Sequence, residues 1–136
     1  MYVEWALPCA DIEDDDRGFT ITGAGQSGFD ATNEEGPFDL PVRLLVCLRY
    51  EPGDENGGTY TFWAQAHGPD GPQPHEAYSM DYPAKNAHSL VPIERKYLWF
   101  AVIVAVLSGG HYRIVLADDI TERYQADLFV AALPSL

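Results

Sequence analysis

The sequence predicts an all-β protein, built as a two-layer antiparallel β-sandwich of seven to eight strands. Short runs of alternating apolar and polar residues recur along the 136-residue chain, as expected of half-buried strands. Twelve glycines and ten prolines separate these runs, and no stretch keeps apolar residues at helical spacing for three turns. Because this length is usual for one domain, residues 1–136 are expected to form a single sandwich.

The first two strands are predicted at either side of an acidic turn. Residues 2–7 ("YVEWAL") alternate, which places Val3, Trp5 and Leu7 on one face of a strand. Residues 18–29 ("GFTITGAGQSGF") predict a second strand whose glycines mark a bulge or a close backbone approach.

The connections between the remaining strands follow from their turn residues. The strands are expected at residues 40–50, 59–67, 75–84, 97–107, 111–117 and 122–131. Residues 51–58 are rich in Pro, Gly, Asp and Asn and predict a hairpin between the third and fourth strands. Residues 108–110 ("SGG") predict a hairpin between the sixth and seventh, and residues 85–96 predict a crossover to the opposite sheet.

Two of the predicted strands are apolar on both faces, in residues 44–48 and 99–107. An antiparallel sandwich usually leaves one face of each sheet in water. The second face must therefore be covered by the 85–96 crossover, by a long loop or by another copy of the protein. We expect a homodimer.

Charge and targeting features limit the partners and the compartment. A formal net charge of −13 repels phosphate backbones and anionic headgroups, so neither nucleic acid nor a membrane surface is an expected partner. Met1 is followed by a strand-like run instead of a secretory signal, and the apolar run 98–107 is too short to cross a membrane. A cytoplasmic protein is expected, in which Cys9 and Cys47 are buried thiols instead of a disulfide.

Both ends of the chain resemble an uncharacterised bacterial family, a domain of unknown function, of short stand-alone β-sandwich proteins. The shared features are the opening "MYVEWAL", a short polar turn and a Gly-rich strand, then a Gly-x-Tyr strand opening at Gly110 and Tyr112 and an acidic turn at Asp118 and Asp119. The resemblance implies an immunoglobulin-like sandwich. It implies no activity, cofactor or catalytic residue.

Two residues in this closing half carry structural expectations. Tyr112 enters a strand and is expected to bury its ring and return its hydroxyl to a backbone carbonyl, as in a tyrosine corner. The turn at Asp118 and Asp119 resembles an Asp-Gly turn of the family, so its second Asp is expected to adopt positive φ at some cost.

The acidic stretch "DIEDDDRG" contains candidate metal ligands. Asp11, Glu13 and Asp15 have the alternate spacing of a calcium loop, and their oxygens suit calcium. However, Asp16 replaces the required Gly and Thr22 replaces the bidentate Glu of an EF-hand. The simpler interpretation is that these acids solvate a turn between the first two strands.

The histidines form no metal-binding motif in the sequence. His67 and His75 could converge across the turn "GPDGPQP", but ordinary strand-end positions are the simpler interpretation. Ser27 lacks the strand-to-helix setting of a nucleophile elbow, and the glycines of residues 23–28 lack the spacing of a phosphate loop. Three tryptophans could stack on sugars, although packing inside the protein or at an interface is favoured; they are Trp5, Trp63 and Trp99.

These observations favour a non-enzymatic binding module that self-associates and docks a protein partner through its loops or its apolar second face. An enzyme is disfavoured, and no cofactor is expected. One alternative is a small metal-binding or metal-dependent protein that uses His67, His75 and nearby carboxylates. A weaker alternative is a carbohydrate-binding module.

Overall fold

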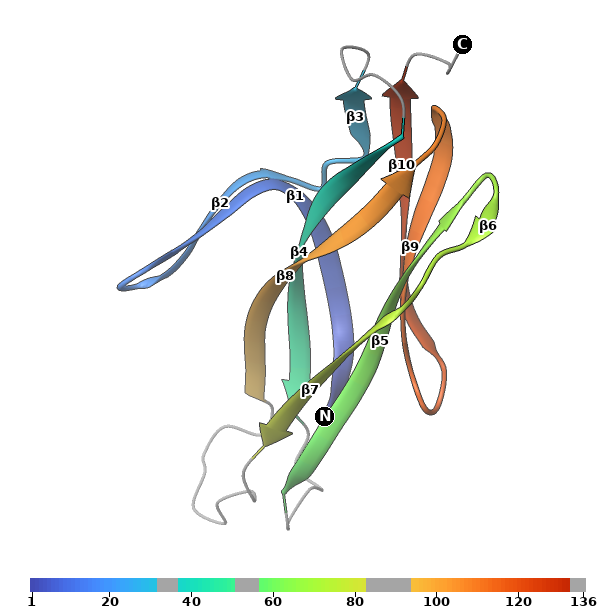
Figure 1. The fold of residues 1–136 in the computed structure, drawn as a ribbon. Helices are drawn as coiled ribbons and strands as arrows, with labels where there is room; N and C mark the ends of the chain where they lie inside the picture. The colour runs from blue at the N-terminus through green and yellow to red at the C-terminus, as the bar shows by residue number, and fades with distance from the viewer. Residues whose placement is uncertain (32–36, 51–56, 83–93, 133–136) are drawn as a thin grey trace.

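A computed structural model describes residues 1–31, 37–50, 57–82 and 94–132, and these form ten strands and no helix (Figure 1). The strands are β1 (Tyr2–Asp15), β2 (Gly18–Ala24), β3 (Gly28–Ala31), β4 (Phe38–Tyr50), β5 (Gly58–Gly68), β6 (Gly71–Pro72), β7 (Glu76–Tyr82), β8 (Glu94–Val106), β9 (Gly110–Asp118) and β10 (Glu122–Ala132). The described part of the chain therefore contains no helix with the length and hydropathy of a membrane span.

The strands form two packed sheets. Sheet A has the order β2-β1-β4-β8, and sheet B has the order β3-β10-β9-β5, with β6 and β7 both paired to β5. Every pairing is antiparallel except that of β3 with β10. The predicted two-layer β-sandwich is confirmed, although the described residues contain more strands than the seven or eight expected.

The strand order is immunoglobulin-like. In sheet A, β1, β4 and β8 occupy the places of strands A, B and E, and in sheet B, β5, β9 and β10 occupy those of C, F and G. In Figure 1 the two layers face each other, and the hairpin of β1 and β2 extends beyond them to the left. This hairpin is an addition to the basic sandwich.

Two of the predicted hairpins are wrong, because the strands that they join lie in different sheets. β4 is in sheet A and β5 in sheet B, so residues 51–58 connect the two layers; residues 51–56 lie outside the described part. In the same way Leu107, Ser108 and Gly109 connect β8 to β9 across the sandwich. Glycine-rich and proline-rich loops suit a hairpin and a crossing equally well, which is why the sequence did not separate them.

The predicted crossover between the strands at residues 75–84 and 97–107 is confirmed, because these strands lie in different sheets. β7 belongs to sheet B and β8 to sheet A, so the chain changes layers between them. Residues 94–96, expected in the crossover, are the first residues of β8, and residues 83–93 lie outside the described part.

The strand predicted over residues 18–29 is in fact two strands in different sheets. Gly25 has a φ of 79°, which favours glycine. The backbone N–H groups of Gly25 and Gln26 both donate to the carbonyl of Pro8, at 2.8 and 3.0 Å. This turn takes the chain from β2 in sheet A to β3 at the edge of sheet B.

The core lies between the sheets and consists of the inward side chains of both layers. Its fully buried members include Leu44, Val46 and Leu48 of β4, Phe62 of β5, Val104 of β8, and Ile114 and Leu116 of β9. Burying side chains of this size stabilises the fold by about 1.5 to 3 kcal/mol each. Taken as whole residues, no polar or charged residue is fully buried in the described part of the chain.

A bulge in β1 overturns the predicted facing of its first residues. The pairing of β1 with β4 shifts between Val3 and Trp5, so Glu4 is an extra residue in the strand. As a result Val3 and Ala6 enter the core, whereas Trp5 and Leu7 pack on the outer face of sheet A.

That outer face explains why residues 44–48 are apolar on both sides. Leu45 is 6% exposed and Cys47 is 0% exposed, although both point away from the core between the sheets. Leu45 forms a cluster with Cys9 and Ile12 of β1, against which Phe19 of β2 and Trp99 of β8 pack. The chain itself therefore covers the second face of β4, so this face does not need another copy of the protein.

Tyr112 forms the predicted tyrosine corner. The residue is 2% exposed, and its hydroxyl donates to the carbonyl of Ser108, four residues upstream. The ring packs so closely on Gly68 that a Cβ there would lie 2.8 Å from Tyr112 Cε1. Glycine is required at this point because of the close approach.

The turn at Asp118 uses a different device from the one predicted. No described residue other than glycine has positive φ, so the expected strain at Asp119 is not present. Instead Asp118 Oδ1 accepts hydrogen bonds from the backbone N–H groups of Ile120 and Thr121, both at 3.0 Å. A side-chain-capped turn of this kind needs no left-handed residue.

Candidate functional site

The acidic stretch lies in the β1–β2 hairpin, where its side chains interact with neighbouring residues of the protein. Asp15 accepts hydrogen bonds from the Arg17 backbone N–H at 2.7 Å and the Thr20 hydroxyl at 2.9 Å, and these bonds lower its pKa. Asp11 Oδ1 lies 3.6 Å from Arg43 Nε. Glu13 lies opposite Thr20 in the backbone register of the hairpin. Asp15 thus stabilises the turn between β1 and β2, and the acids before it extend along β1 itself. A calcium site at Asp11, Glu13 and Asp15 stays a prediction.

The two histidines proposed as metal ligands lie on the same sheet but in separate depressions. His67 lines one with Arg113, and His75 lines another with Trp63. The described residues contain no group of three or more His, Cys, Asp and Glu side chains that could hold a metal ion. A metal at His67 and His75 stays a prediction.

The most distinctive surface is the outer face of sheet B, here called the histidine face. Its members come from alternate positions of β5, β9 and β10 and from the residue before β7; they are Trp63, Gln65, His67, His75, His111, Arg113, Val115, Ala117, Asp127 and Phe129. Three of the chain's four histidines lie here. Because the strands fix the backbone, these side chains are held on a rigid support.

Two shallow depressions lie on this face. The first has a volume of about 280 Å³ and is lined by Trp63, Gln65, His75, Val115 and Ala117. The second has a volume of about 360 Å³ and is lined by His67, Gly68, Gly71, Pro72, His111, Tyr112 and Arg113. The first combines an aromatic ring with polar groups, and the second is bordered by groups that can carry positive charge.

Arg113 is the notable charge on the histidine face. Four other arginines form ion pairs: Arg43 with Asp11, Arg49 and Arg95 with Glu4, and Arg123 with Asp118. Arg113 is exposed and forms no ion pair within the described ranges, since its cross-strand neighbour Asp127 instead lies 2.9 Å from His111 Nε2. Arg17 and Lys96 likewise form no ion pair within the described ranges, so Arg113 is set apart by its place on the histidine face.

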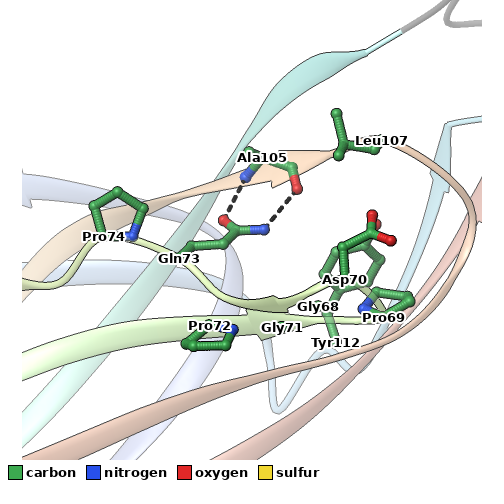
Figure 2. Close-up of a pocket in the computed structure, with 10 residues that line it drawn as sticks. All are labelled: Gly68, Pro69, Asp70, Gly71, Pro72, Gln73, Pro74, Ala105, Leu107 and Tyr112. Carbon is green, nitrogen blue, oxygen red and sulfur yellow. Dashed lines mark hydrogen bonds between the residues drawn. The ribbon is translucent and has the colours of Figure 1, made fainter.

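A third depression, of about 250 Å³, is formed by residues 68–74 beside β8 (Figure 2). Gln73 spans it: its Nε2 donates to the Ala105 carbonyl at 2.7 Å, and its Oε1 accepts from the Ala105 N–H at 2.8 Å. The backbone of Gln73 meanwhile bonds to Ala66 and Gln65 of β5. Gln73 therefore joins the edges of the two sheets.

The tryptophans do not form one stacking platform. Trp5 and Trp99 are half-buried on the outer face of sheet A, where they pack against Leu45 and Cys9, whereas Trp63 lies on sheet B. Trp5 also contacts Tyr97 with their planes tilted by 54°. Packing was the favoured interpretation for these residues, and it is confirmed for Trp5 and Trp99.

Both cysteines are free and buried, as predicted. Burial raises the pKa of both thiols, and for Cys47 the neighbouring Glu4 carboxylate raises it further. A thiol is a poor nucleophile when its thiolate is disfavoured.

We therefore expect a thiol-disulfide exchange reagent to react with neither cysteine in the native protein and with both in denaturant. Asp16→Cys, in the exposed turn, is the control that reacts at once, and rapid native labelling of Cys9 or Cys47 would contradict the prediction.

Comparison with known proteins gives no family for this chain. No protein-family model matches it, and no curated protein matches it. The resemblance to a bacterial domain of unknown function stays a prediction.

Sequence reasoning did not single out Arg113 or Gln73, which the structure places at the histidine face and at the joint between the sheets. The alternation of Trp63, Gln65 and His67 was visible and indicates a shared face. The pairing of this face with Arg113 was not visible, because it depends on the register between β5 and β9.

Proposed function

We propose that this protein is a non-enzymatic binding module that docks a protein partner on the histidine face. The observation that carries the proposal is the joint presence of Trp63 and Arg113 on one rigid face, flanked by His67, His75 and His111. Trp and Arg are the residues most enriched among those that dominate binding energies at protein interfaces.

The distance between Trp63 and Arg113 defines how the contacting side chains of the partner must be spaced. Trp63 and His67 are four residues apart on β5, which corresponds to about 13 Å at a strand rise of ~3.3 Å per residue, and Arg113 is the cross-strand partner of His67. A fitting partner places an apolar side chain in the depression at Trp63 and a carboxylate beside Arg113. The surrounding negative charge disfavours partners that lack a basic rim.

The test uses affinity capture followed by titration of the purified, identified partner. Trp63→Ala and Arg113→Glu are each expected to weaken the Kd at least about tenfold, because each removes a central anchor. Arg17→Glu is the matched control: it makes the same charge change in the β1–β2 turn, away from the face, and should alter the Kd by less than about twofold.

Two results would contradict this proposal. A partner whose affinity is unchanged by both substitutions would bind elsewhere on the molecule. Quenching of tryptophan fluorescence by oligosaccharides, lost in Trp63→Phe, would assign the depression at Trp63 to carbohydrate instead of protein.

A further inference from the structure

We propose that the free edge of β8 pairs with the same edge of a second copy, so that the two A sheets form one continuous sheet. This interaction surface lies on the opposite layer from the histidine face and does not depend on it. Within the described ranges β8 pairs with β4 on one side, and no strand pairs with it on the other.

Gln73 identifies which backbone groups face that edge. Both the N–H and the carbonyl of Ala105 point away from β4, since both bond to the Gln73 side chain. The pairing of β8 with β4 runs without a register shift. In an antiparallel ladder the N–H and carbonyl of one residue point to the same side, and this alternates along the strand. The outward groups are therefore those of Tyr97, Trp99, Ala101 and Ile103.

The edge lacks the features by which proteins usually prevent edge pairing. Charged residues, prolines and bulges normally protect such strands, but residues 97–107 contain no charge and no proline. At its end, Gln73 already takes the place of a partner strand at Ala105 (Figure 2). Tyr97 and Ile103 are also each 49% exposed beside this edge, which is unusual for large apolar residues in a strand.

A second copy is the occupant that this edge fits best. Antiparallel pairing of one strand with itself has a two-fold axis, which is the symmetry of most homodimers. With the axis at Phe100, Tyr97 of each copy lies opposite Ile103 of the other, and Trp99 lies opposite Ala101. The large Trp99 side chain thus lies opposite the small Ala101, and the aromatic Tyr97 lies opposite the β-branched Ile103. Both are favourable cross-strand pairs.

The residues of this edge strand add no like charge that would oppose self-association. Each copy carries a net charge of −13, so two copies repel each other over most approaches. The stretch from Tyr97 to Leu107 contains no charged residue of its own, and its ends are set by Lys96 before it and by the Gln73 clamp at Ala105. One carboxylate from another element lies against it, since Asp14 Oδ1 of the β1–β2 hairpin accepts a hydrogen bond from Trp99 Nε1 at 2.8 Å.

The test is light scattering coupled to size exclusion on the full-length protein, from about 1 to about 100 µM. We expect a dimer whose dissociation constant rises at least about tenfold in Ala101→Pro, because proline removes an outward N–H that the fold itself does not use. Ala101→Ser keeps the N–H and is the matched control, with unchanged association. Ile103→Lys charges the edge without altering the backbone and should also weaken the dimer.

Hydrogen exchange on the unmodified protein keeps the proposal testable if a variant fails to fold. The amides of Trp99, Ala101 and Ile103 should exchange more slowly as concentration rises, while those of β2, at the opposite edge of sheet A, stay unchanged. A monomer throughout the concentration range, a dimer that survives both edge variants, or protection of β2 instead of β8 would each overturn the proposal.

Discussion

Replacing Asp118 with asparagine is expected to lower the free energy of unfolding by about 2 to 3 kcal/mol at neutral pH. The Asp118 side chain is only 3% exposed, and Arg123 Nε and the Tyr60 hydroxyl each donate to its Oδ2 at 2.7 Å. The same Tyr60 hydroxyl accepts from the Val3 N–H, at 3.2 Å, so this carboxylate supports a connection between the two sheets. Asparagine keeps the shape but leaves Arg123 without its counter-charge.

The pH dependence of this loss of stability distinguishes the effect of the Asp118 charge from the effect of its side-chain shape. Burial by itself would raise the pKa of Asp118, but the hydrogen bonds from Tyr60 and Arg123 outweigh it and lower the pKa from 3.8 to about 2. A carboxyl whose pKa is lower in the folded state stabilises the fold above its unfolded pKa, and this contribution is lost as pH falls towards the folded value. The gap between wild type and Asp118→Asn should therefore close between about pH 4 and pH 2.

Denaturant unfolding across this pH range is the measurement. Asp119→Asn is the control, since Asp119 is exposed and adjacent in sequence, and it should change stability by less than about 0.5 kcal/mol. A difference between wild type and Asp118→Asn that stays constant down to pH 2 would contradict the electrostatic origin.

Gly68→Ala is expected to destabilise the protein by about 1 to 3 kcal/mol, through overpacking alone. An added Cβ would lie 2.8 Å from Cε1 and 3.1 Å from Cδ1 of Tyr112. The ring cannot easily move, because it is 2% exposed and tied by its hydroxyl to Ser108. Calorimetric melting or denaturant unfolding measures the effect.

Gly28→Ala is the matched control for this substitution. Gly28 is also a strand glycine, without positive φ, and an added Cβ there meets no atom within 4 Å. Alanine at Gly28 should leave stability unchanged or raise it slightly, because it restricts the unfolded chain. If the penalty of Gly68→Ala persisted in a Tyr112→Leu background, the clash with the ring would not be its cause.

The sequence predicted the class of fold because strand periodicity is a local property. It also predicted the tyrosine corner and the buried thiols, since each depends on a residue type and its position within one strand. Ordinary alternation failed in β1, where the bulge at Glu4 separates Val3 from Trp5. A bulge adds one residue without any distinctive side chain, so periodicity does not detect it.

The sheet to which each strand belongs was harder to predict than the strand itself. Residues 51–58 and 108–110 contain typical hairpin residues, yet both connect opposite layers. The composition of the histidine face was partly visible in Trp63, Gln65 and His67, but Arg113 joins it only through the register of β9 with β5. Such long-range pairing is set by the packing of the whole core and not by the local sequence.

The crossing pattern of the strands also has a consequence for how the chain folds. Among the strands that the structure describes, only the pairs β1–β2, β5–β6 and β9–β10 join strands that follow each other directly, whereas β4 pairs with β1 and with β8. Contacts between segments that are distant in the sequence require the closing of long loops, and this costs conformational entropy before the contacts can stabilise the fold. Proteins dominated by such contacts fold in milliseconds to seconds. Because β8 follows β3, β5, β6 and β7 in the chain, sheet A can be completed only after these strands of sheet B have been synthesised, whereas β9 and β10 of sheet B follow later.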